Sequence, residues 1–358
     1  MHVAIVCRGL GGSGSVAAVA LRQARELSRT MRVTLVSDSF APDETLPHVV
    51  ARVPDLHLLR RFRHVFDEML FARAAKRVVR AIAPDAIVCH SHVTAYLSTG
   101  DVPYAMVMHG DVHDRPRGTY DPRVTALYRF VTPRAYRNAA IVFAPARHTM
   151  ALAEQGGAKH VVTLPVGIDP LDVGAADDVG VAHDGGPLRI LFVGRLAIEK
   201  GLDVLLDACA LLDVDYELDI VGSGSLEREI RARRNGRIRF LGQHPRRELG
   251  ALYRSHHVFC LPARSETFGV VVLEALACGL PAIVTSVGGM PDMVEDGVNG
   301  LLVQTEDARS VADAIERVAR DESLRRRLAA NARASVLPRF EWSAIGERMA
   351  DVLRTMRA

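Results

Sequence analysis

Two carboxylates flank a turn in the stretch between residues 264 and 274, Arg-Ser-Glu-Thr-Phe-Gly-Val-Val-Val-Leu-Glu. An apolar run at 258–262 precedes this turn and predicts a buried strand, and a helical pattern follows it. Carboxylates accept hydrogen bonds, so Glu266 and Glu274 are suited to bind sugar hydroxyls beside backbone amides that hold a charged group. The alternative interpretation is that both glutamates are solvated charges at a helix end.

The turn itself consists of Phe268, Gly269 and Val270, which open the predicted helix just past the carboxyl end of the strand. The first amides of a helix have no partner within the helix and attract anions or polar ligand atoms. Gly269 lets a ligand approach the backbone closely. Glu274 lies two turns further along in an otherwise apolar segment, which favours a functional role over a solvated charge.

Two cations, Arg195 and Lys200, follow another predicted strand and are bracketed by Gly194 and Gly201. A forked guanidinium and a point ammonium suit a diphosphate, although the spacing is not that of a Walker loop. Asp213-Val-Asp215 precedes its strand, so no Asp-x-Asp stands at a carboxyl end where it could hold a metal-bound diphosphate. The sequence therefore predicts that the two cations neutralise a leaving group without a metal.

A histidine, His109, ends the predicted strand 104–108 and is followed by glycine. Ligands of α/β proteins bind at the carboxyl ends of strands, so this position favours a binding role, with a core histidine as the alternative. Because His90, His92 and His113 lie nearby in the sequence, a metal cluster has to be considered. Their spacing is not that of a helical zinc site, and His90 and His92 follow a different strand, so we expect neither a metal nor another cofactor.

The length and composition indicate an ordinary globular protein with two domains, because the chain has 358 residues, 49% hydrophobic and 24% charged. The net charge of +3 is too small to indicate a nucleic-acid partner. The apolar start is too short for a signal peptide, and no run reaches the roughly 18 residues of a spanning helix, so we expect a cytoplasmic protein. Five cysteines in apolar patterns predict buried free thiols: Cys7, Cys89, Cys209, Cys260 and Cys278.

Strands and helices alternate along the whole chain, which predicts an α/β fold with two Rossmann-like, doubly wound domains. We expect an N-terminal domain over 1–169, a linker over 170–187, a second domain over 188–337 and a last helix within 338–358. The predicted strands are 3–7, 33–37, 85–89, 104–108, 140–144, 161–165, 188–193, 216–221, 238–241, 257–261 and 282–285.

A helical period between residues 59 and 82 carries many basic side chains. They are Arg60, Arg61, Arg63, Arg73, Lys76, Arg77 and Arg80. One interpretation is a surface helix with a solvated basic face. The other is peripheral attraction to the inner face of an anionic membrane that carries a lipid acceptor.

Four ordered motifs accompany the glutamate pair, each at a predicted strand end. They are residues 192–201 (Phe-Val-Gly-Arg-Leu-Ala-Ile-Glu-Lys-Gly), 220–224 (Ile-Val-Gly-Ser-Gly), 240–242 (Phe-Leu-Gly) and 287–303, which begins Val-Gly-Gly-Met-Pro. With Glu, seven residues, Glu and Ala-x-Ala-Cys-Gly-x-Pro, this pattern resembles the donor site of the retaining glycosyltransferases of family 4, which have the GT-B fold. The resemblance is dense over 188–303 and looser elsewhere.

This resemblance implies two domains that face each other across a cleft, with the last helix crossing back to the first domain. The implied reaction moves a hexose, with retention, from a UDP- or GDP-sugar to a glycan, lipid-linked or small-molecule acceptor. Cell-surface polysaccharide or glycolipid synthesis would be the setting. Val166 departs from the pattern, because the family usually has Asn before Gly167. The alternatives are an epimerase-type or a purely sugar-nucleotide-binding protein of the same fold.

The resemblance also implies roles for individual residues. His109 and Glu266 would hold sugar hydroxyls, Glu274 the ribose, and Arg195 with Lys200 the diphosphate. The glycine loop at 9–14, unless it is a simple tight turn, would approach the donor phosphate or the acceptor. The remaining candidate substrate contacts are Gly11, Gly12, Gly194, Gly222, Gly242, Gln243, His244, Phe268, Gly269 and Val270, with Gly242-Gln243-His244 next to the base.

Overall fold

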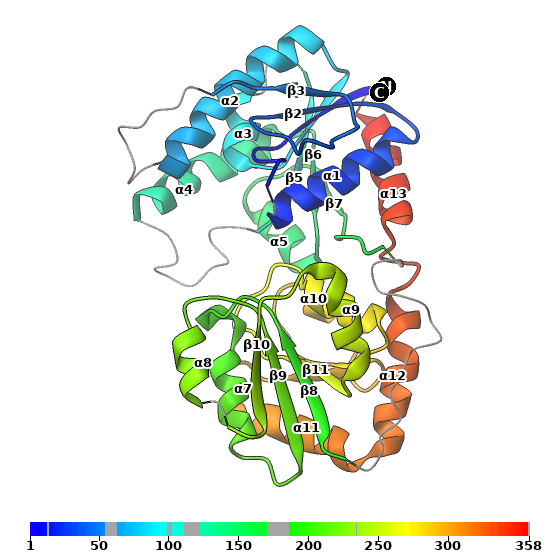
Figure 1. The fold of residues 1–358 in the computed structure, drawn as a ribbon. Coiled ribbons are helices and arrows are strands. Elements are labelled where there is room, and N and C mark those ends of the chain that lie inside the picture. Colours follow the sequence, from blue (N-terminus) through cyan, green and yellow to red (C-terminus); the bar gives the residue numbers. More distant parts are fainter. Residues whose placement is uncertain are drawn as a thin grey trace. The chain divides into compact units, whose positions relative to one another are not determined.

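A computed structural model of the chain describes residues 1–12, 14–53, 63–98, 102–110, 122–169, 186–233 and 235–356. The chain divides into two compact units. The N-terminal unit contains Met1–Val166 and Trp342–Ala358, and the C-terminal unit contains Gly167–Glu341. Each unit is an α/β sandwich built on a parallel sheet (Figure 1).

The sheet of the N-terminal unit has seven strands in the order β3-β2-β1-β4-β5-β6-β7, and all neighbouring strands are parallel. Strands β1, β2, β4, β5 and β6 are almost wholly buried apolar runs, as expected where helices cover both faces of a sheet. The strands are β1 (His2–Val6), β2 (Arg32–Ser37), β3 (His48–Val50), β4 (Ala86–Cys89), β5 (Tyr104–Val107), β6 (Ile141–Ala144) and β7 (Val161–Thr163).

Helices cover both faces of this sheet. They are α1 (Ser15–Ser28), α2 (Arg63–Ile82), α3 (His92–Ser98), α4 (Pro122–Asn138), α5 (Arg147–Gln155) and α13 (Trp342–Thr355). Apolar residues of α1 and α13 share one core with the sheet, and Figure 1 shows these two helices side by side. Side chains of α2, α4 and α5 share a second core. The C-terminal helix therefore packs on the same sheet as the first strand.

The sheet of the C-terminal unit has six parallel strands in the order β10-β9-β8-β11-β12-β13. The strands are β8 (Leu188–Val193), β9 (Tyr216–Val221), β10 (Ile238–Gly242), β11 (Val258–Leu261), β12 (Ala282–Thr285) and β13 (Gly300–Val303). Its α-helices are α7 (Leu202–Cys209), α8 (Glu227–Arg233), α9 (Arg246–Ser255), α10 (Val270–Ala277), α11 (Ala308–Arg320) and α12 (Glu322–Val336). Short 3-10 helices are η4 (Ile198–Lys200) and η5 (Met290–Asp292).

In both sheets the strand order reverses beside the first strand, because β1 lies between β2 and β4, and β8 lies between β9 and β11. Loops that leave the carboxyl ends of two strands at such a point diverge to opposite faces and leave a crevice for ligands. The fold therefore marks two places for a site: the loops after β1 and β4, and the loops after β8 and β11.

The predicted fold class is confirmed, since both units are doubly wound parallel sheets. The elements that were not predicted include the strands β3 and β13 and the helices α3, α4 and α5. The helix predicted from residue 59 is described from Arg63 onward. The predicted linker 170–187 lies almost wholly outside the described residues, as do Arg60 and Arg61. All five cysteines are buried and free, as predicted.

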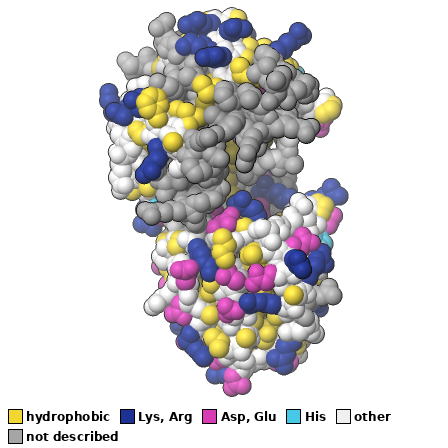
Figure 2. Space-filling model, turned by 90° about the vertical axis from the view of Figure 1, so that its left-hand side faces the viewer, with side chains coloured by type: hydrophobic (Ala, Val, Ile, Leu, Met, Phe, Trp, Pro, Cys, Tyr) yellow, Lys and Arg dark blue, Asp and Glu magenta, His cyan; other side chains and the backbone are white. Residues whose placement is uncertain are grey.

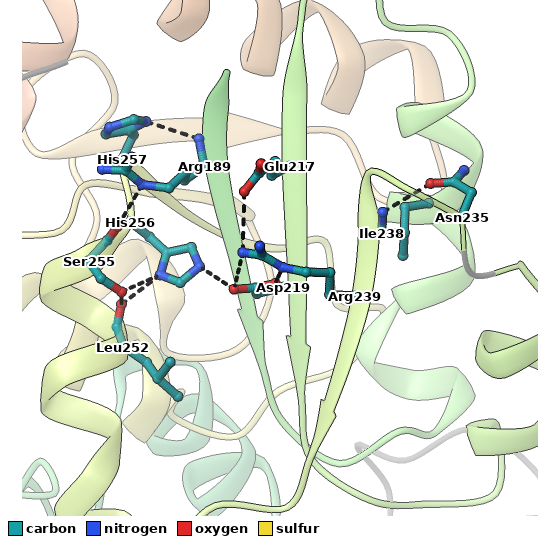
Figure 3. A network of polar contacts seen from close by, with 10 residues as sticks. All are labelled: Arg189, Glu217, Asp219, Asn235, Ile238, Arg239, Leu252, Ser255, His256 and His257. Carbon is teal, nitrogen blue, oxygen red and sulfur yellow. Dashed lines mark hydrogen bonds and ion pairs between the residues drawn. The ribbon is translucent and has the colours of Figure 1, made fainter. Parts of the chain in front are cut away.

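A buried charge network joins strands and helices within the C-terminal unit (Figure 3). Asp219 on β9 is 4% exposed and accepts two hydrogen bonds from Arg239 on β10, at 2.7 and 2.9 Å. His256, before β11, lies 3.1 Å from the same carboxylate. Burial alone would raise the pKa of Asp219, but the bonds from His256 and Arg239 lower it to about 2. This carboxylate therefore stays charged in the core.

The exterior of the C-terminal unit is mixed in character. On the face that Figure 2 shows, acidic, basic and hydrophobic side chains are interspersed over this unit. Such a surface fits the small net charge of +3 and gives this face no field of one sign among the described side chains. Among the described helices, none combines the length and the apolar character that a membrane span requires.

Candidate active site

The loops after β8 and β11 bring a cation and a carboxylate together in the C-terminal unit. Lys200, at the end of η4, donates to Glu266 across 2.7 Å. Both side chains are mostly buried, 15% and 14% exposed. Since β8 and β11 are neighbouring strands, this pair lies at the reversal point of the sheet. A charge-assisted bond of this kind is well placed to hold an anion and a hydroxyl-bearing group side by side.

A second set of contacts ties these two loops to each other. The amides of Arg264 and Ser265 donate to the carbonyl of Glu199, at 2.9 and 3.3 Å. The Arg264 guanidinium forms a bidentate pair with Asp203 on α7, at 2.7 and 2.8 Å, and also donates to the Ile198 carbonyl at 2.7 Å. The hydrogen bond to Asp203 raises the pKa of Arg264 above its ordinary value. The loop that carries Lys200 is thereby fixed to the loop that carries Glu266.

Two glycines permit this close approach. Gly201 has φ +65°, and a Cβ there would overlap the carbonyl of Pro262, just after β11. Gly288 has φ +57°, and a Cβ there would overlap the carbonyl of Glu266. Only glycine meets both demands, a left-handed backbone and no side chain. The loop after β12, which contains Gly288, therefore packs directly against the backbone of Glu266.

Glu274 lies in α10, is 6% exposed, and its carboxylate contacts side chains of α9. Arg246 at the start of α9 reaches one oxygen at 2.7 Å, and the Tyr253 hydroxyl donates to the other at 3.0 Å. Burial, together with the neighbouring Glu274 charge, raises the pKa of Tyr253 well above its ordinary value, so this hydroxyl stays a donor. These contacts orient the Glu274 carboxylate within the C-terminal unit.

Arg195 is less constrained than Lys200. Its guanidinium pairs with Glu199 at 3.0 Å, and its side chain is 57% exposed. The structure therefore separates the two predicted cations: Lys200 is paired with Glu266, and Arg195 with Glu199 on the same loop.

Three predicted glycines meet at the carboxyl ends of β8, β9 and β10. The Gly194 amide donates to Val221, and the Gly222 amide donates to Gly242, at 3.0 and 2.8 Å. A Cβ on Gly222 would overlap the Gly194 carbonyl, so these backbones touch. Beside them, exposed Gln243 accepts from Ser223 at 3.5 Å. His244 lies 3.2 Å from Glu248.

Helix α10 begins at Val270 with Gly269 as its cap residue, at φ +95°, which confirms the predicted helix start after the strand. Phe268 is 3% exposed, and its ring packs 6.0 Å from that of Phe340. The Phe268 side chain is therefore a core group, so any ligand contact of this residue must come from its backbone.

In the N-terminal unit, His109 follows β5 and contacts His90, which follows the neighbouring strand β4. His90 Nδ1 lies 2.8 Å from His109 Nε2, and the rings stack with their centroids 5.1 Å apart. Burial lowers the pKa of both rings, that of His109 to about 4, so the pair is neutral near pH 7.

The loop after β1 contains two glycines that were predicted to contact a ligand, and packing explains why one of them is glycine. The Gly11 amide donates to Ser39 at 3.1 Å, and a Cβ on Gly11 would come within 2.9 Å of the Phe40 backbone. Gly12 is exposed, and its amide donates to Gly9 at 2.9 Å. Packing alone thus accounts for glycine at Gly11, whereas ligand binding at either position stays a prediction.

Within the described residues, no group of three or more His, Cys, Asp or Glu side chains could hold a metal ion. His113, considered for such a group, lies outside the described residues, as does the neighbouring Asp111. His92 instead lies 3.1 Å from the hydroxyl of Tyr136 on α4.

Sequence reasoning did not assign a supporting role to the residues that hold the candidate groups in place. They are His90, Asp203, Arg246, Tyr253, Arg264 and Gly288. His90 was considered only for a metal group, although it follows the strand before His109 and consecutive parallel strands are often neighbours. Arg264 and Gly288 lie inside the quoted motifs, but no role was assigned to them.

Two family profiles match successive stretches of the chain. Residues 13–170 match Glycosyltransferase Family 4, and residues 176–335 match Glycosyl transferases group 1. The fold, the reversal-point site and these matches together place the chain among the GT-B glycosyltransferase enzymes of group 1/family 4. The resemblance predicted from the motifs is thereby confirmed.

Curated relatives are similar mainly over half of the chain. A D-inositol 3-phosphate glycosyltransferase of Xylanimonas cellulosilytica is 40% identical over 172 residues, which cover 46% of this chain and 41% of the relative. A phosphatidyl-myo-inositol mannosyltransferase of Mycobacterium leprae is 35% identical over 175 residues, 47% of this chain and 46% of the relative. The matched stretch thus spans less than half the length of these relatives.

Solved structures share the fold over nearly the whole chain. The sucrose-phosphate synthase of Thermosynechococcus elongatus has a TM-score of 0.84 at 21% identity, covering 99% of this chain and 98% of that one. Anabaena HepE in complex with UDP has a TM-score of 0.79 at 19% identity, covering 99% and 100%. At these identities the likeness establishes the fold alone.

Proposed function

We propose that this protein is a retaining glycosyltransferase that moves a hexose from a UDP- or GDP-sugar to an acceptor hydroxyl. The observation that carries the proposal is the Lys200–Glu266 contact of 2.7 Å at the reversal point of the C-terminal sheet. It sets a cation for a diphosphate beside an acceptor for sugar hydroxyls, which is the pair of groups that a nucleotide sugar requires. Complexes of Anabaena HepE with UDP and UDP-glucose support this type of donor.

In this proposal Lys200 and Arg195 neutralise the leaving diphosphate, and Glu266 binds hydroxyls of the transferred sugar. Glu274 binds the ribose, and the backbone at 268–270 supplies amides. Gly194, Gly222 and the segment 242–244 lie along the nucleotide. The family resemblance assigns His109 to the donor sugar and the loop with Gly11 and Gly12 to the donor phosphate or the acceptor.

The chemical step breaks the bond between the sugar C1 and the oxygen of the β-phosphate, and the electron pair leaves with the diphosphate. The acceptor oxygen forms the new bond to C1 on the same face, so the configuration is retained. A phosphate oxygen takes the acceptor proton. No carboxylate is needed as a base, and the cations stabilise the charge that develops on the leaving group.

A metal-independent reaction is part of the proposal. It rests on Asp213 and Asp215, which precede β9 and do not follow it. It also rests on Lys200 and Arg195 as the cations that would neutralise the leaving group. Both cations can reach anionic oxygens directly. Excess chelator should therefore leave turnover unchanged.

The relatives and helix α2 support a proposal for the acceptor and the pathway. The curated relatives act, by name, on inositol phosphate or phosphatidyl-myo-inositol. We infer a glycan, lipid-linked or small-molecule acceptor in cell-surface polysaccharide or glycolipid synthesis. Helix α2 presents exposed Arg73, Arg77 and Arg80, with Lys76 half-buried, which supports peripheral binding to an anionic membrane.

Two experiments test this function. A thermal-shift panel of UDP, GDP, ADP and their sugars identifies the donor, since ligand at 100 times its Kd adds about 2.7 kcal/mol. Incubating the stabilising donor with candidate acceptors must then give a glycoside with retained configuration. Donor consumption without a transferred sugar would instead support an epimerase-type protein, and binding without consumption a purely sugar-nucleotide-binding protein.

Membrane binding has its own test. The protein should sediment with anionic vesicles, not with neutral ones, and salt should release it. A triple variant, Arg73→Gln, Arg77→Gln and Arg80→Gln, should lose this binding while its donor binding is unchanged. If the wild type fails to sediment at low salt, α2 is an ordinary solvated helix.

A further inference from the structure

His90 is a buried polar group for which the proposed reaction has no use. It follows β4, is 6% exposed, and its backbone amide is fixed by a 3.1 Å bond to the carbonyl of Val6 on β1. Within the part of the chain that the structure describes, its ring has one hydrogen-bond contact, between Nδ1 and His109 Nε2 at 2.8 Å. Among the described residues, its Nε2 has no hydrogen-bond partner.

A buried imidazole with an unsatisfied nitrogen costs free energy, so its presence calls for a compensating role. In the described part of the chain, the hydrogen bond of the His90 ring is made to His109. A role for His90 is therefore to be sought in its effect on His109.

Two neutral imidazoles that share one bond determine each other's tautomer. If His90 Nδ1 carries the hydrogen, His109 Nε2 is bare and its Nδ1 is protonated; if His109 Nε2 carries it, its Nδ1 is bare. Burial lowers the pKa of both rings, so neither ring is in the charged imidazolium form near pH 7. His109 Nε2 is engaged in either case, which leaves Nδ1 as the ring nitrogen that can meet a ligand.

We propose that His90 is a positioning residue that fixes the ring orientation and tautomer of His109, so that His109 Nδ1 meets a hydroxyl of the donor sugar with one defined polarity. The inference rests on the proposed function, in which His109 contacts that sugar. It also specifies the chemistry of His109. This ring acts as a neutral hydrogen-bonding group and not as a general acid or base through Nε2.

Two substitutions of His90 form a matched pair. Asn places its amide where His90 Nδ1 lies, whereas Gln places its amide nearer the position of Nε2. We expect His90→Asn to keep kcat within about threefold and His90→Gln to lower it about tenfold, the value of one hydrogen bond. Neither should change the Kd of the free nucleoside diphosphate, because His109 meets the sugar. Equal activity of the two variants at equal melting temperature would overturn the proposal.

Nuclear magnetic resonance of histidines labelled with ¹⁵N provides a readout that does not depend on turnover. In the wild type and in His90→Asn, the His109 nitrogens should show a single tautomer with a hydrogen-bonded Nε2. In His90→Gln they should show an exchanging mixture. Because the wild-type spectrum is itself informative, a mixture there would refute the proposal even if a variant failed to fold.

The double variant separates this inference from the proposed function. If His109→Ala lowers kcat, adding His90→Gln should lower it no further, since His90 acts only through His109. A further loss would show that His90 acts elsewhere and would contradict the proposal. If His109→Ala is fully active while its wild-type tautomer is single, the proposed role of His109 fails, but the His90–His109 lock stands.

Discussion

The division of work between Glu266 and Glu274 can be tested with two isosteric substitutions, Glu266→Gln and Glu274→Gln. Each removes one negative charge and keeps the volume. The structure gives the two carboxylates different partners: Lys200 for Glu266, and Arg246 with Tyr253 for Glu274. Each substitution should therefore alter a different kinetic constant.

Glu274→Gln should raise the donor KM and the Kd of the free diphosphate by about tenfold to a hundredfold. A hydrogen bond to a charged group contributes about 1.5–3 kcal/mol, and the variant weakens such a bond to the ribose. The ribose is unchanged during transfer, so kcat should stay within about twofold. Arg246 is half exposed and remains solvated, so little stability should be lost.

Glu266→Gln should behave in the opposite way. The Lys200–Glu266 attraction at 2.7 Å is about 6 kcal/mol at an effective dielectric constant of 20, an upper value that desolvation reduces. Without that charge Lys200 is freer to meet phosphate, so the free diphosphate should bind equally well or up to about tenfold tighter. The sugar gains positive charge in the transition state, so kcat should fall about a hundredfold.

The assay combines calorimetry with the free diphosphate and steady-state rates for both variants. Glu316→Gln is the matched control, because Glu316 is a partly buried carboxylate on α11 that pairs with Arg320 at 3.1 Å, away from the site loops. It should change neither constant. If Glu266→Gln weakens the diphosphate and Glu274→Gln does not, the two roles are reversed.

Three further outcomes are expected. Because its folded pKa of about 2 lies below its ordinary 3.8, Asp219 contributes about 2 kcal/mol of stability above pH 4 that is lost as the pH falls toward 2. Asp219→Asn should speed amide hydrogen exchange of β9 at pH 7 and should make the stability of the unit depend less on pH between about 4 and 2. Unchanged exchange would contradict this. Gly288→Ala should lower kcat at least tenfold by displacing Glu266, visible as lost turnover with the unit still folded by circular dichroism. Turnover should persist in excess chelator, and loss of activity that magnesium or manganese restores would refute metal independence.

The fold was predictable from local patterns, because buried parallel strands are apolar runs and each is followed by a helical period. The start of α10 at Val270 is an example: apolar 258–262, then Gly269, define a strand, a turn and a helix. The missed α4 shows the limit of this reasoning. Its residues, Pro122–Asn138, contain an internal proline, which argues against a helix in the sequence, yet Val131, Ala135 and Tyr136 form a buried apolar face in the structure.

The candidate groups were predictable, but their partners were not. Motifs name Lys200 and Glu266, yet the contact between them depends on β11 lying beside β8, which is a fact of strand order. The Arg264–Asp203 pair joins residues 61 apart, and Arg246 meets Glu274 from a different helix. Side chains that orient a ligand-binding group carry no local signature, because charged residues in loops are common whatever their partners.

The many contacts that fix the loop carrying Lys200 have a physical reason if this residue stabilises a leaving group. A cation that is to stabilise a leaving group must already be in place, since reorganising it during the reaction would cost the energy that it is meant to supply. Glu199 contributes only its backbone carbonyl to Arg264 and Ser265, and Ile198 likewise, so the path of η4 is fixed without using the side chain of Lys200. The Lys200 backbone is thus fixed by its loop and its ammonium by Glu266, so in the proposed reaction the ammonium could contact a diphosphate without rearrangement of the loop.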